Sequence, residues 1–277
     1  MIIMRKSAIL LLVLIKSMTL FAQEDSLYIS LDEALKHPKE VYQLDLSMKG
    51  LTEVPASICR LTNLNSLGLF NNKLSSLPQC MGDMIMLTSI DLSDNQFTEV
   101  PSCIYEMDNL TMLVMSSNLL ATLSDSLGNL IGMTNLDFSK NSITILPESI
   151  TDLTNLQSLS LGYNKLEYLP ESMGFLVNLT DLYLYDNNLS VLPESLGNLY
   201  NLQDLLVGAN SLMALPESIG DLTNLINLDA RNNKLILLPS TLTNIVGLSY
   251  LNVTENKIPK SEVKRIKAKL PKCEIED

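Results

Sequence analysis

Asp181 and Asp204 are the two side chains whose type and spacing come nearest to catalytic chemistry in this sequence. They occupy equivalent positions in successive stretches of similar sequence. If those stretches stack as strands, the carboxylates lie about 5 Å apart, as in retaining glycosidases. Such enzymes also need a pocket that excludes water and raises one carboxyl pKa, and an open strand face provides little of that. Two carboxylates are also too few to complete the oxygen shell of Ca²⁺. We therefore predict neither catalysis nor a metal site at this pair.

Other reactive residues are scarce. The chain has a single histidine, His37, beside Pro38 near the N-terminal end, far from most other candidate nucleophiles. Phosphate-binding glycine loops, HExxH and CxxC motifs do not occur in the sequence. These observations predict a protein that is not an enzyme and carries no cofactor.

One repeated sequence unit organises most of the chain. Each unit reads L-x-x-L-x-L-x-x-N-x-L-x-x-L-P-x-x-[IL]-x-x-L-x-x, with no insertion between units. The units begin at Val41, Leu64, Leu87, Leu110, Met133, Leu156, Leu179, Leu202, Leu225 and Leu248. A fixed period of this length indicates a solenoid in which each unit buries its apolar stripe against its neighbours.

The pattern resembles the leucine-rich repeat family over about residues 41–258. The segment LPES[IL]G[ND]L, present in several units, is similar to the 23-residue subclass found in bacterial repeat proteins and in intracellular Ras-associated scaffolds. The resemblance implies an α/β fold, a curved horseshoe solenoid with a parallel β-sheet on its concave face and short helical or extended turns on its convex face. It also implies that the chain binds proteins.

The residues themselves agree with this architecture. Leu182 and Leu184 alternate with Asp181, Tyr183 and Tyr185, so this strand should have one buried and one wet face. Every unit after the first has an asparagine whose amide can satisfy backbone groups that leave the strand. This column is Asn72, Asn95, Asn118, Asn141, Asn164, Asn187, Asn210, Asn233 and Asn256.

Both ends of the repeat array need a cap. Residues 23–40 are predicted to form an N-terminal helical cap, with a short helix within 26–40 that begins at Ser30 and ends at Pro38. Residues 259–277 are predicted to form a helix from about 260 to 269 and a strand around Cys273–Ile275. This end is rich in lysine, but we interpret the lysines as the solvated face of a cap helix. A chain with net charge −12 offers no general basic face for nucleic acid.

Cys80 and Cys103 occupy the same repeat position, two residues after the proline, where other units have serine or threonine. A disulfide between these adjacent units and two buried thiols are both consistent with the pattern. Cys59 and Cys273 lie at opposite ends of the array and cannot pair with each other.

Residues 1–22 differ in composition from the rest of the chain. Arg5 and Lys6 precede an apolar run, Lys16 shortens that run, and Ala22 stands before a polar stretch. These features predict a cleaved signal peptide, residues 1–22, and hence a secreted, periplasmic or cell-envelope protein with no stable membrane span. An uncleaved N-terminal anchor remains an alternative. An intracellular scaffold would require that this segment not be a signal.

The outward positions of the strands are free to vary, and they carry the candidate binding surface. Most are serine, asparagine or glycine, but units six to eight gather tyrosines bordered by carboxylates, and the strip continues through two further units. The predicted partner-binding residues are Tyr163, Asp181, Tyr183, Tyr185, Asp186, Asp204, Leu206, Arg231 and Tyr250. The carboxylates favour a ligand with basic or hydroxyl groups, and tyrosine is enriched in binding hot spots.

These residues favour a protein or peptide as the partner. Three alternatives stay open: an envelope structural or adhesion protein, a carbohydrate-binding protein whose tyrosines stack on sugars, and tyrosines that only stiffen the sheet. The sequence does not set the ligand's identity or the oligomeric state.

Overall fold

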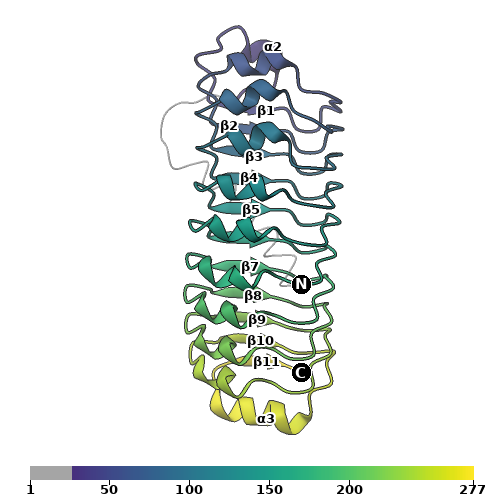
Figure 1. The fold of residues 1–277 in the computed structure, drawn as a ribbon, viewed down its shortest axis with the longest axis vertical. Coiled ribbons are helices and arrows are strands. Elements are labelled where there is room, and N and C mark those ends of the chain that lie inside the picture. The colour runs from purple at the N-terminus through teal and green to yellow at the C-terminus, as the bar shows by residue number, and fades with distance from the viewer. Residues whose placement is uncertain (1–26) are drawn as a thin grey trace.

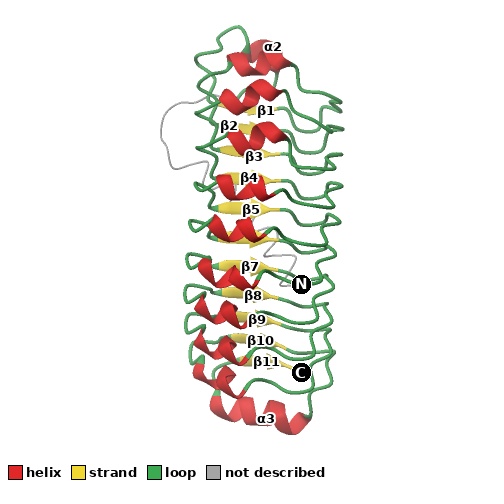
Figure 2. Ribbon diagram, viewed as in Figure 1, coloured by secondary structure: helices red, strands yellow, loops and turns green. Residues whose placement is uncertain are grey.

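Each of the first nine repeat units folds into one coil that pairs a short β-strand with a short 3₁₀-helix, and the strand of the tenth unit is followed by an α-helix (Figure 1). The computed structural model describes residues 27–277, so the predicted signal peptide lies outside the described residues. Successive coils stack along one axis with the strands on one side and the 3₁₀-helices on the other (Figure 2). We call the sheet surface that faces away from the 3₁₀-helices the open face.

Within residues 27–277, eleven strands form one parallel, unclosed and curved sheet in sequence order. Neighbouring strands pair at a separation of one repeat, for example Leu182 with Leu205. The strands are β1 (Gln43–Asp45), β2 (Ser66–Gly68), β3 (Ser89–Asp91), β4 (Met112–Val114), β5 (Asn135–Asp137), β6 (Ser158–Ser160), β7 (Asp181–Tyr183), β8 (Asp204–Leu206), β9 (Asn227–Asp229), β10 (Tyr250–Asn252) and β11 (Glu274–Glu276). This topology confirms the predicted α/β solenoid.

The 3₁₀-helices begin directly after the proline of each unit. Proline suits this N-cap position because its fixed φ matches the entry to a helical turn and its missing N–H needs no partner. Ser124 replaces the proline in the fourth unit, and its Oγ accepts a hydrogen bond from Ser126 N at 3.1 Å. The helices are η1 (Ala56–Arg60), η2 (Gln79–Asp83), η3 (Ser102–Glu106), η4 (Asp125–Asn129), η5 (Glu148–Asp152), η6 (Glu171–Phe175), η7 (Glu194–Asn198), η8 (Glu217–Asp221) and η9 (Ser240–Asn244).

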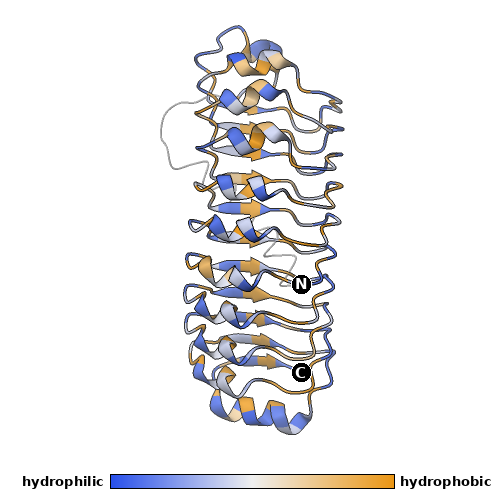
Figure 3. Cartoon of the chain, viewed as in Figure 1, coloured by the Kyte–Doolittle hydropathy of each residue, from blue (hydrophilic) through white to orange (hydrophobic). Residues whose placement is uncertain are grey.

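The core is the leucine-filled space between the sheet and the 3₁₀-helices. Leu182 and Leu184 are fully buried, whereas Tyr183 between them is half-buried on the open face. Figure 3 shows the same alternation as apolar residues that recur in the strand of each coil. The period-two pattern therefore places leucine inside and the variable residues on the open face, as predicted.

The asparagine column forms a continuous hydrogen-bonded ladder. Asn187 Nδ2 donates to the carbonyl oxygens of Leu161 and Leu184, both at 3.0 Å, and its Oδ1 accepts from Leu166 N at 2.9 Å. The other eight asparagines make the same kinds of bond, so the predicted role of this column is confirmed. Each amide ties its own coil to the preceding one, because Leu184 belongs to the same unit as Asn187 and the other two partners belong to the unit before.

A left-handed backbone residue precedes the asparagine position of each unit, and the sequence pattern alone did not reveal it. Its φ lies between 50° and 59° in all ten units, and no glycine is used there. The column is Met48, Asn71, Asp94, Ser117, Lys140, Tyr163, Asp186, Ala209, Asn232 and Glu255. This conformation costs a non-glycine residue about 1 kcal/mol, and the buried hydrogen bonds of the adjacent asparagine offset that cost. Four of these residues are asparagine or aspartate, the types that tolerate it best.

The two ends differ in how they close the core. The N-terminal helix α2 (Leu31–Ala34) begins after Ser30 as predicted but ends four residues before Pro38, because the backbone continues in tight turns in which Lys36 N and His37 N donate to the carbonyl oxygens of Glu33 and Ala34. Before the helix, Tyr28 bridges to Leu44 in β1. Ser30 stands at the N-cap position but makes no side-chain capping bond. The C-terminal helix α3 (Lys260–Lys269) has the expected bounds and buries Val263 and Ile266.

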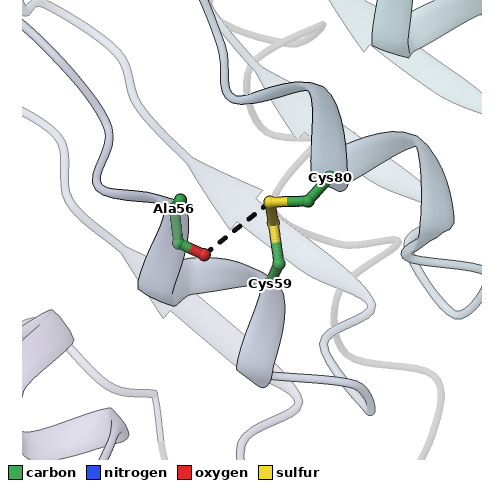
Figure 4. The surroundings of a disulfide bond; sticks show 3 residues. All are labelled: Ala56, Cys59 and Cys80. Carbon is green, nitrogen blue, oxygen red and sulfur yellow. Dashed lines mark hydrogen bonds between the residues drawn. A yellow bond between two sulfur atoms is a disulfide. The ribbon is translucent and has the colours of Figure 1, made fainter.

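The disulfide prediction was wrong in its partner. Cys80 is bonded to Cys59, with the two Cα atoms 6.0 Å apart (Figure 4). Cys103 is a free, buried thiol. Burial raises the pKa of the Cys103 thiol to about 11.

Cys80 pairs with Cys59 and not with Cys103 because neighbouring coils are staggered on the side of the 3₁₀-helices. Strands pair one full repeat apart, as Gln43 does with Ser66, but the bonded cysteines are 21 residues apart. The same diagonal contact recurs farther along, where a Cβ built on Gly128 would lie 2.9 Å from the Cβ of Ser149. Cys59 occupies the position that is Gly128 in the fourth unit, so the sulfurs fill space that glycine leaves elsewhere. Cys80 and Cys103, at equivalent positions, are not direct neighbours in this sense.

Candidate functional site

The predicted binding residues of units six to eight lie on the open face. Tyr183 ends β7, and Leu206 ends the neighbouring β8; both are half-buried. Tyr185 follows β7 and is also half-buried, whereas Tyr163 and Asp186 occupy the left-handed turn position and are exposed. The 3₁₀-helices are all on the other side of the sheet (Figure 2). The tyrosines therefore face solvent from a rigid, hydrogen-bonded backbone.

Tyr163 and Tyr185 form an aromatic pair across two adjacent coils. Their ring centroids are 5.1 Å apart and their planes are perpendicular. Edge-to-face packing of this kind contributes about 0.5–1.5 kcal/mol beyond area burial. Burial, together with the nearby charge of Asp137, raises the pKa of the Tyr185 hydroxyl to about 12. The ring is thus held in a defined place while part of it remains accessible.

Tyr183 and Asp181 form a second local unit. The Tyr183 hydroxyl donates to Asp181 Oδ1 at 3.0 Å, and Thr180 Oγ1 donates to Asp181 Oδ2 at 2.8 Å. Burial raises the pKa of Asp181 and the nearby charge of Asp204 adds to the rise, while the hydrogen bonds from Thr180 and Tyr183 oppose it. Burial and the two carboxylates together raise the pKa of Tyr183 well above its ordinary value.

Asp204 is the strand partner of Asp181 in the sheet, as the sequence predicts. It also accepts a hydrogen bond from Asn227 on the next strand. Both carboxylates are therefore fixed by neighbouring side chains on an open surface. This arrangement suits them to recognise a bound group.

Arg231 and Tyr250 lie toward the C-terminal end, apart from the tyrosines of units six to eight. Arg231 Nε is 3.5 Å from a carboxylate oxygen of Asp229, whose side chain is only 8% exposed. The Tyr250 hydroxyl accepts from Asn252 Nδ2 at 3.1 Å. Strands are spaced about 4.8 Å apart, so Tyr250 on β10 is roughly 14 Å from β7. The structure brings Tyr163, Asp181, Tyr183, Tyr185 and Asp204 together and leaves these two at the border.

Four other aspartates of the open face have a structural role that sequence reasoning missed. Asp45, Asp91, Asp137 and Asp229 each accept a hydrogen bond from the backbone N–H two residues ahead. The signal was an Asp-x-Ser pattern, present at the first three of these positions, in which an aspartate caps its own strand end. Burial raises the pKa of the carboxyl groups of Asp91, Asp137 and Asp229.

Sequence reasoning also missed an apolar row along one edge of the solenoid, in the loops between the asparagine and the 3₁₀-helix. In units five to nine the residue two before the proline is large and apolar in all but one unit, and it is 47–60% exposed. Two exposed apolar residues that stand three before the proline adjoin these, and we define the edge row as Ile145, Tyr168, Val191, Met213, Ile236 and Leu237. The signal is visible in the sequence, because units one to four have Glu53, Ser76, Glu99 and Thr122 there.

Residues 27–277 contain no group of three or more His, Cys, Asp or Glu side chains placed to hold a metal ion. Within the same residues, no helix is both long and apolar enough to cross a bilayer. His37 is exposed in the segment after α2, at the opposite end from α3 and away from the tyrosines.

Comparison with protein families finds a known repeat in this chain. A model described as leucine rich repeat matches residues 108–166, and a second model with the same description matches residues 86–107 and 178–199. The last of these segments includes Asp181, Tyr183 and Tyr185. Among curated proteins, none matches the chain in sequence.

Solved structures share the fold over most of the chain. An internalin (inlF) from Listeria monocytogenes is 22% identical, covers 91% of this chain over 73% of its own, and has a TM-score of 0.77. The plant peptide hormone receptor RGFR1, in complex with RGF2, is 28% identical over 91% of this chain and 42% of its own, with a TM-score of 0.76. The Arabidopsis receptor kinase HAESA, in complex with the peptide hormone IDA and the co-receptor SERK1, is 28% identical. The match covers 79% of this chain and 39% of HAESA, with a TM-score of 0.70. This chain thus spans less than half the length of the two plant receptors.

Proposed function

The chain is a leucine-rich repeat protein, and from this premise we propose that it is a non-enzymatic recognition module that binds a protein or peptide on the open face of its sheet. Leucine-rich repeats are a protein-interaction fold, and two of the similar structures are plant receptors in complex with peptide hormones. The observation that carries the proposal is the gathering of Tyr163, Tyr183 and Tyr185 on a face that is otherwise mostly small and polar.

The chemistry around the tyrosines defines the proposed ligand. Asp181, Asp186 and Asp204 border the rings, and the whole chain has net charge −12. A partner segment with basic or hydroxyl groups beside apolar side chains complements this surface. Tyrosines on a rigid sheet also bind at a low entropy cost, because little side-chain freedom remains to be lost.

The proposal is tested by selecting peptides and then removing one surface at a time. A random-peptide display library is enriched on the immobilised full chain, and the dissociation constants of the selected peptides are measured by calorimetry. The double variant Y183S/Y185S should weaken binding at least ~10-fold. Serine already stands at the equivalent of Tyr183 in unit six, Ser160, and at equivalents of Tyr185 such as Ser139, so the fold should tolerate the change.

The matched control is Y168S/V191S, which removes two large residues from the edge row. It should change the dissociation constant less than ~2-fold. Loss of binding in the edge variant with retention in the tyrosine variant would place the site on the edge row and overturn the proposal. A glycan array that captures the chain, with no peptide enriched, would favour carbohydrate binding instead.

We also propose that the chain is exported. The support is the basic and apolar N-terminal segment together with the Cys59–Cys80 bond, since disulfides persist mainly in oxidising compartments. Mass spectrometry of the protein from its native host should find an N-terminus near Gln23. A chain that retains Met1 would contradict cleavage and favour the anchored alternative.

A further inference from the structure

Tyr185 lies flat over Gly162, the residue that takes the equivalent position in the preceding unit. A Cβ built on Gly162 would be 2.5 Å from Tyr185 Cζ and 2.7 and 2.8 Å from the two Cε atoms. Three ring atoms at nearly equal distance mean that the ring presents its face, and not its edge, to the glycine. Gly162 is correspondingly buried. Any side chain at this position would have to displace the ring.

The repeat itself does not require glycine here. The same column carries serine in units one, three, four and five, at Ser47, Ser93, Ser116 and Ser139. Glycine is unfavourable in extended segments because it loses more backbone freedom on folding than other residues. Gly162 therefore needs a local reason, and the ring of Tyr185 supplies one.

A second glycine of this column shows the same relation. A Cβ on Gly208 would be 3.2 Å from Arg231 Cγ, in the following unit, so the arginine stem also leans back over a glycine. The contact is looser than the one at Gly162. Both glycines of the column precede a large side chain that belongs to the predicted binding strip. Phe70 is the remaining large residue of the column, and the equivalent residue of the preceding unit is Ser47 and not glycine.

We propose that Gly162 is a positioning residue of the binding face: it seats the ring of Tyr185 against the sheet, where Tyr163 packs on it. This inference rests on the proposed function, because it assigns Gly162 a role in binding through Tyr185. A seated ring is ordered before the partner arrives, so less freedom is lost on binding. The backbone of Tyr163 is left-handed, with φ of 55°, as at the equivalent position of every unit, so its conformation does not depend on Gly162.

The first test needs no ligand. Tyr185 titrates with a pKa raised to about 12 by burial. Because exposure favours the charged form, displacing the ring in G162A should lower this pKa toward the ordinary value of about 10. The titration is followed by NMR of ¹³C-labelled tyrosine, with the Tyr185 signal assigned from Y185F. The control is G247A, whose added Cβ would meet its nearest neighbouring atom at 3.8 Å, an ordinary contact.

An unchanged Tyr185 titration in G162A would overturn the proposal. If G162A does not fold, the variant G162A/Y185S decides, because it lacks the ring that the new methyl group would strike. If the double variant folds, the proposed contact between the Tyr185 ring and Gly162 is supported. If it also fails to fold, that contact is refuted.

The second test is a double-mutant cycle with a peptide from the display selection. G162A should weaken binding at least ~10-fold in the wild-type background and have no further effect in the Y185S background. An equal loss in both backgrounds would show that Gly162 acts without Tyr185 and would overturn the inference. If G162A shifts the titration but Y183S/Y185S does not affect binding, the seat stands and the proposed function fails.

Discussion

Removing the Cys59–Cys80 bond should loosen the N-terminal end of the solenoid and leave the remaining coils in place. The variant best suited to this is C59G/C80S, because glycine and serine occupy the same two positions at Gly128 and Ser149. It therefore deletes the covalent link and keeps the packing found in other units. The bond joins residues 21 positions apart, and closing a loop of that length stabilises a fold by about 3 kcal/mol in the chain-entropy model.

The loss should be local, because repeat coils interact mainly with their nearest neighbours. Within the described residues the cap at this end is small: α2 has four residues, and Tyr28 before it pairs with β1 through an isolated bridge. Amide protons in β1 and η1 should lose up to ~100-fold in hydrogen-exchange protection, which corresponds to about 3 kcal/mol. Protection in β6 to β8, which position the tyrosines, should change little.

Hydrogen exchange followed by mass spectrometry measures both regions in one experiment. The control is C273S, which changes a cysteine outside the bond. An equal loss of protection along the whole chain would mean that the coils open as one cooperative unit, contrary to the nearest-neighbour argument. No loss at the N-terminal end would mean that coil stacking alone secures it.

Three further predictions concern the repeat framework. A209G should raise the free energy of unfolding by about 0.5–1 kcal/mol in urea titrations, because Ala209 holds a left-handed φ of 53° that glycine adopts freely; a loss of stability would contradict the strain argument. N187A should lower it by about 2–4 kcal/mol, because the amide serves buried backbone groups of Leu161, Leu184 and Leu166; a cost below about 1 kcal/mol would refute that role. Stability should fall as pH rises from about 4 toward neutrality, because burial raises the pKa of Asp137 above its unfolded value of 3.8 and the folded state then binds the proton more tightly than the unfolded state. In thermal melts, the melting temperature of D137N should depend less on pH than that of the wild type.

Much of the fold could be predicted because the spacing and residue types of the repeat determine which positions form strands and which are buried. A strand that alternates leucine with variable residues has one possible buried face, so Leu182 and Tyr183 were assigned to opposite sides of the sheet correctly. The asparagine column was equally informative, since a buried amide must find backbone partners. Period and residue type together define what each position needs.

Contacts between coils were harder to predict because equivalence in sequence is not contact in space. Strands meet at equivalent positions, one full repeat apart, but the opposite side of each coil meets its neighbour on a shorter diagonal. Cys80 and Cys103 are equivalent and unbonded, whereas Cys59 and Cys80 are inequivalent and bonded. The seat of Tyr185 on Gly162 was missed for a related reason: a column of letters gives the identity of a side chain but not the direction in which it leans.

The sheet's own ends bear on which surface is free to recognise a partner. The last strand, β11, pairs with β10 on one side only, and its residues Glu274 and Glu276 flank Ile275. Charged side chains on an edge strand oppose the addition of another strand, and Glu276 Oε2 already accepts from Asn252 Nδ2 at 2.7 Å. The inward-facing leucines of the strands are enclosed, and α3 buries its Val263 and Ile266 at the C-terminal end of the array. Between the two ends of residues 27–277 the open face presents its variable side chains beside the exposed edge row, and the tyrosines of units six and seven combine a fixed backbone with accessible rings.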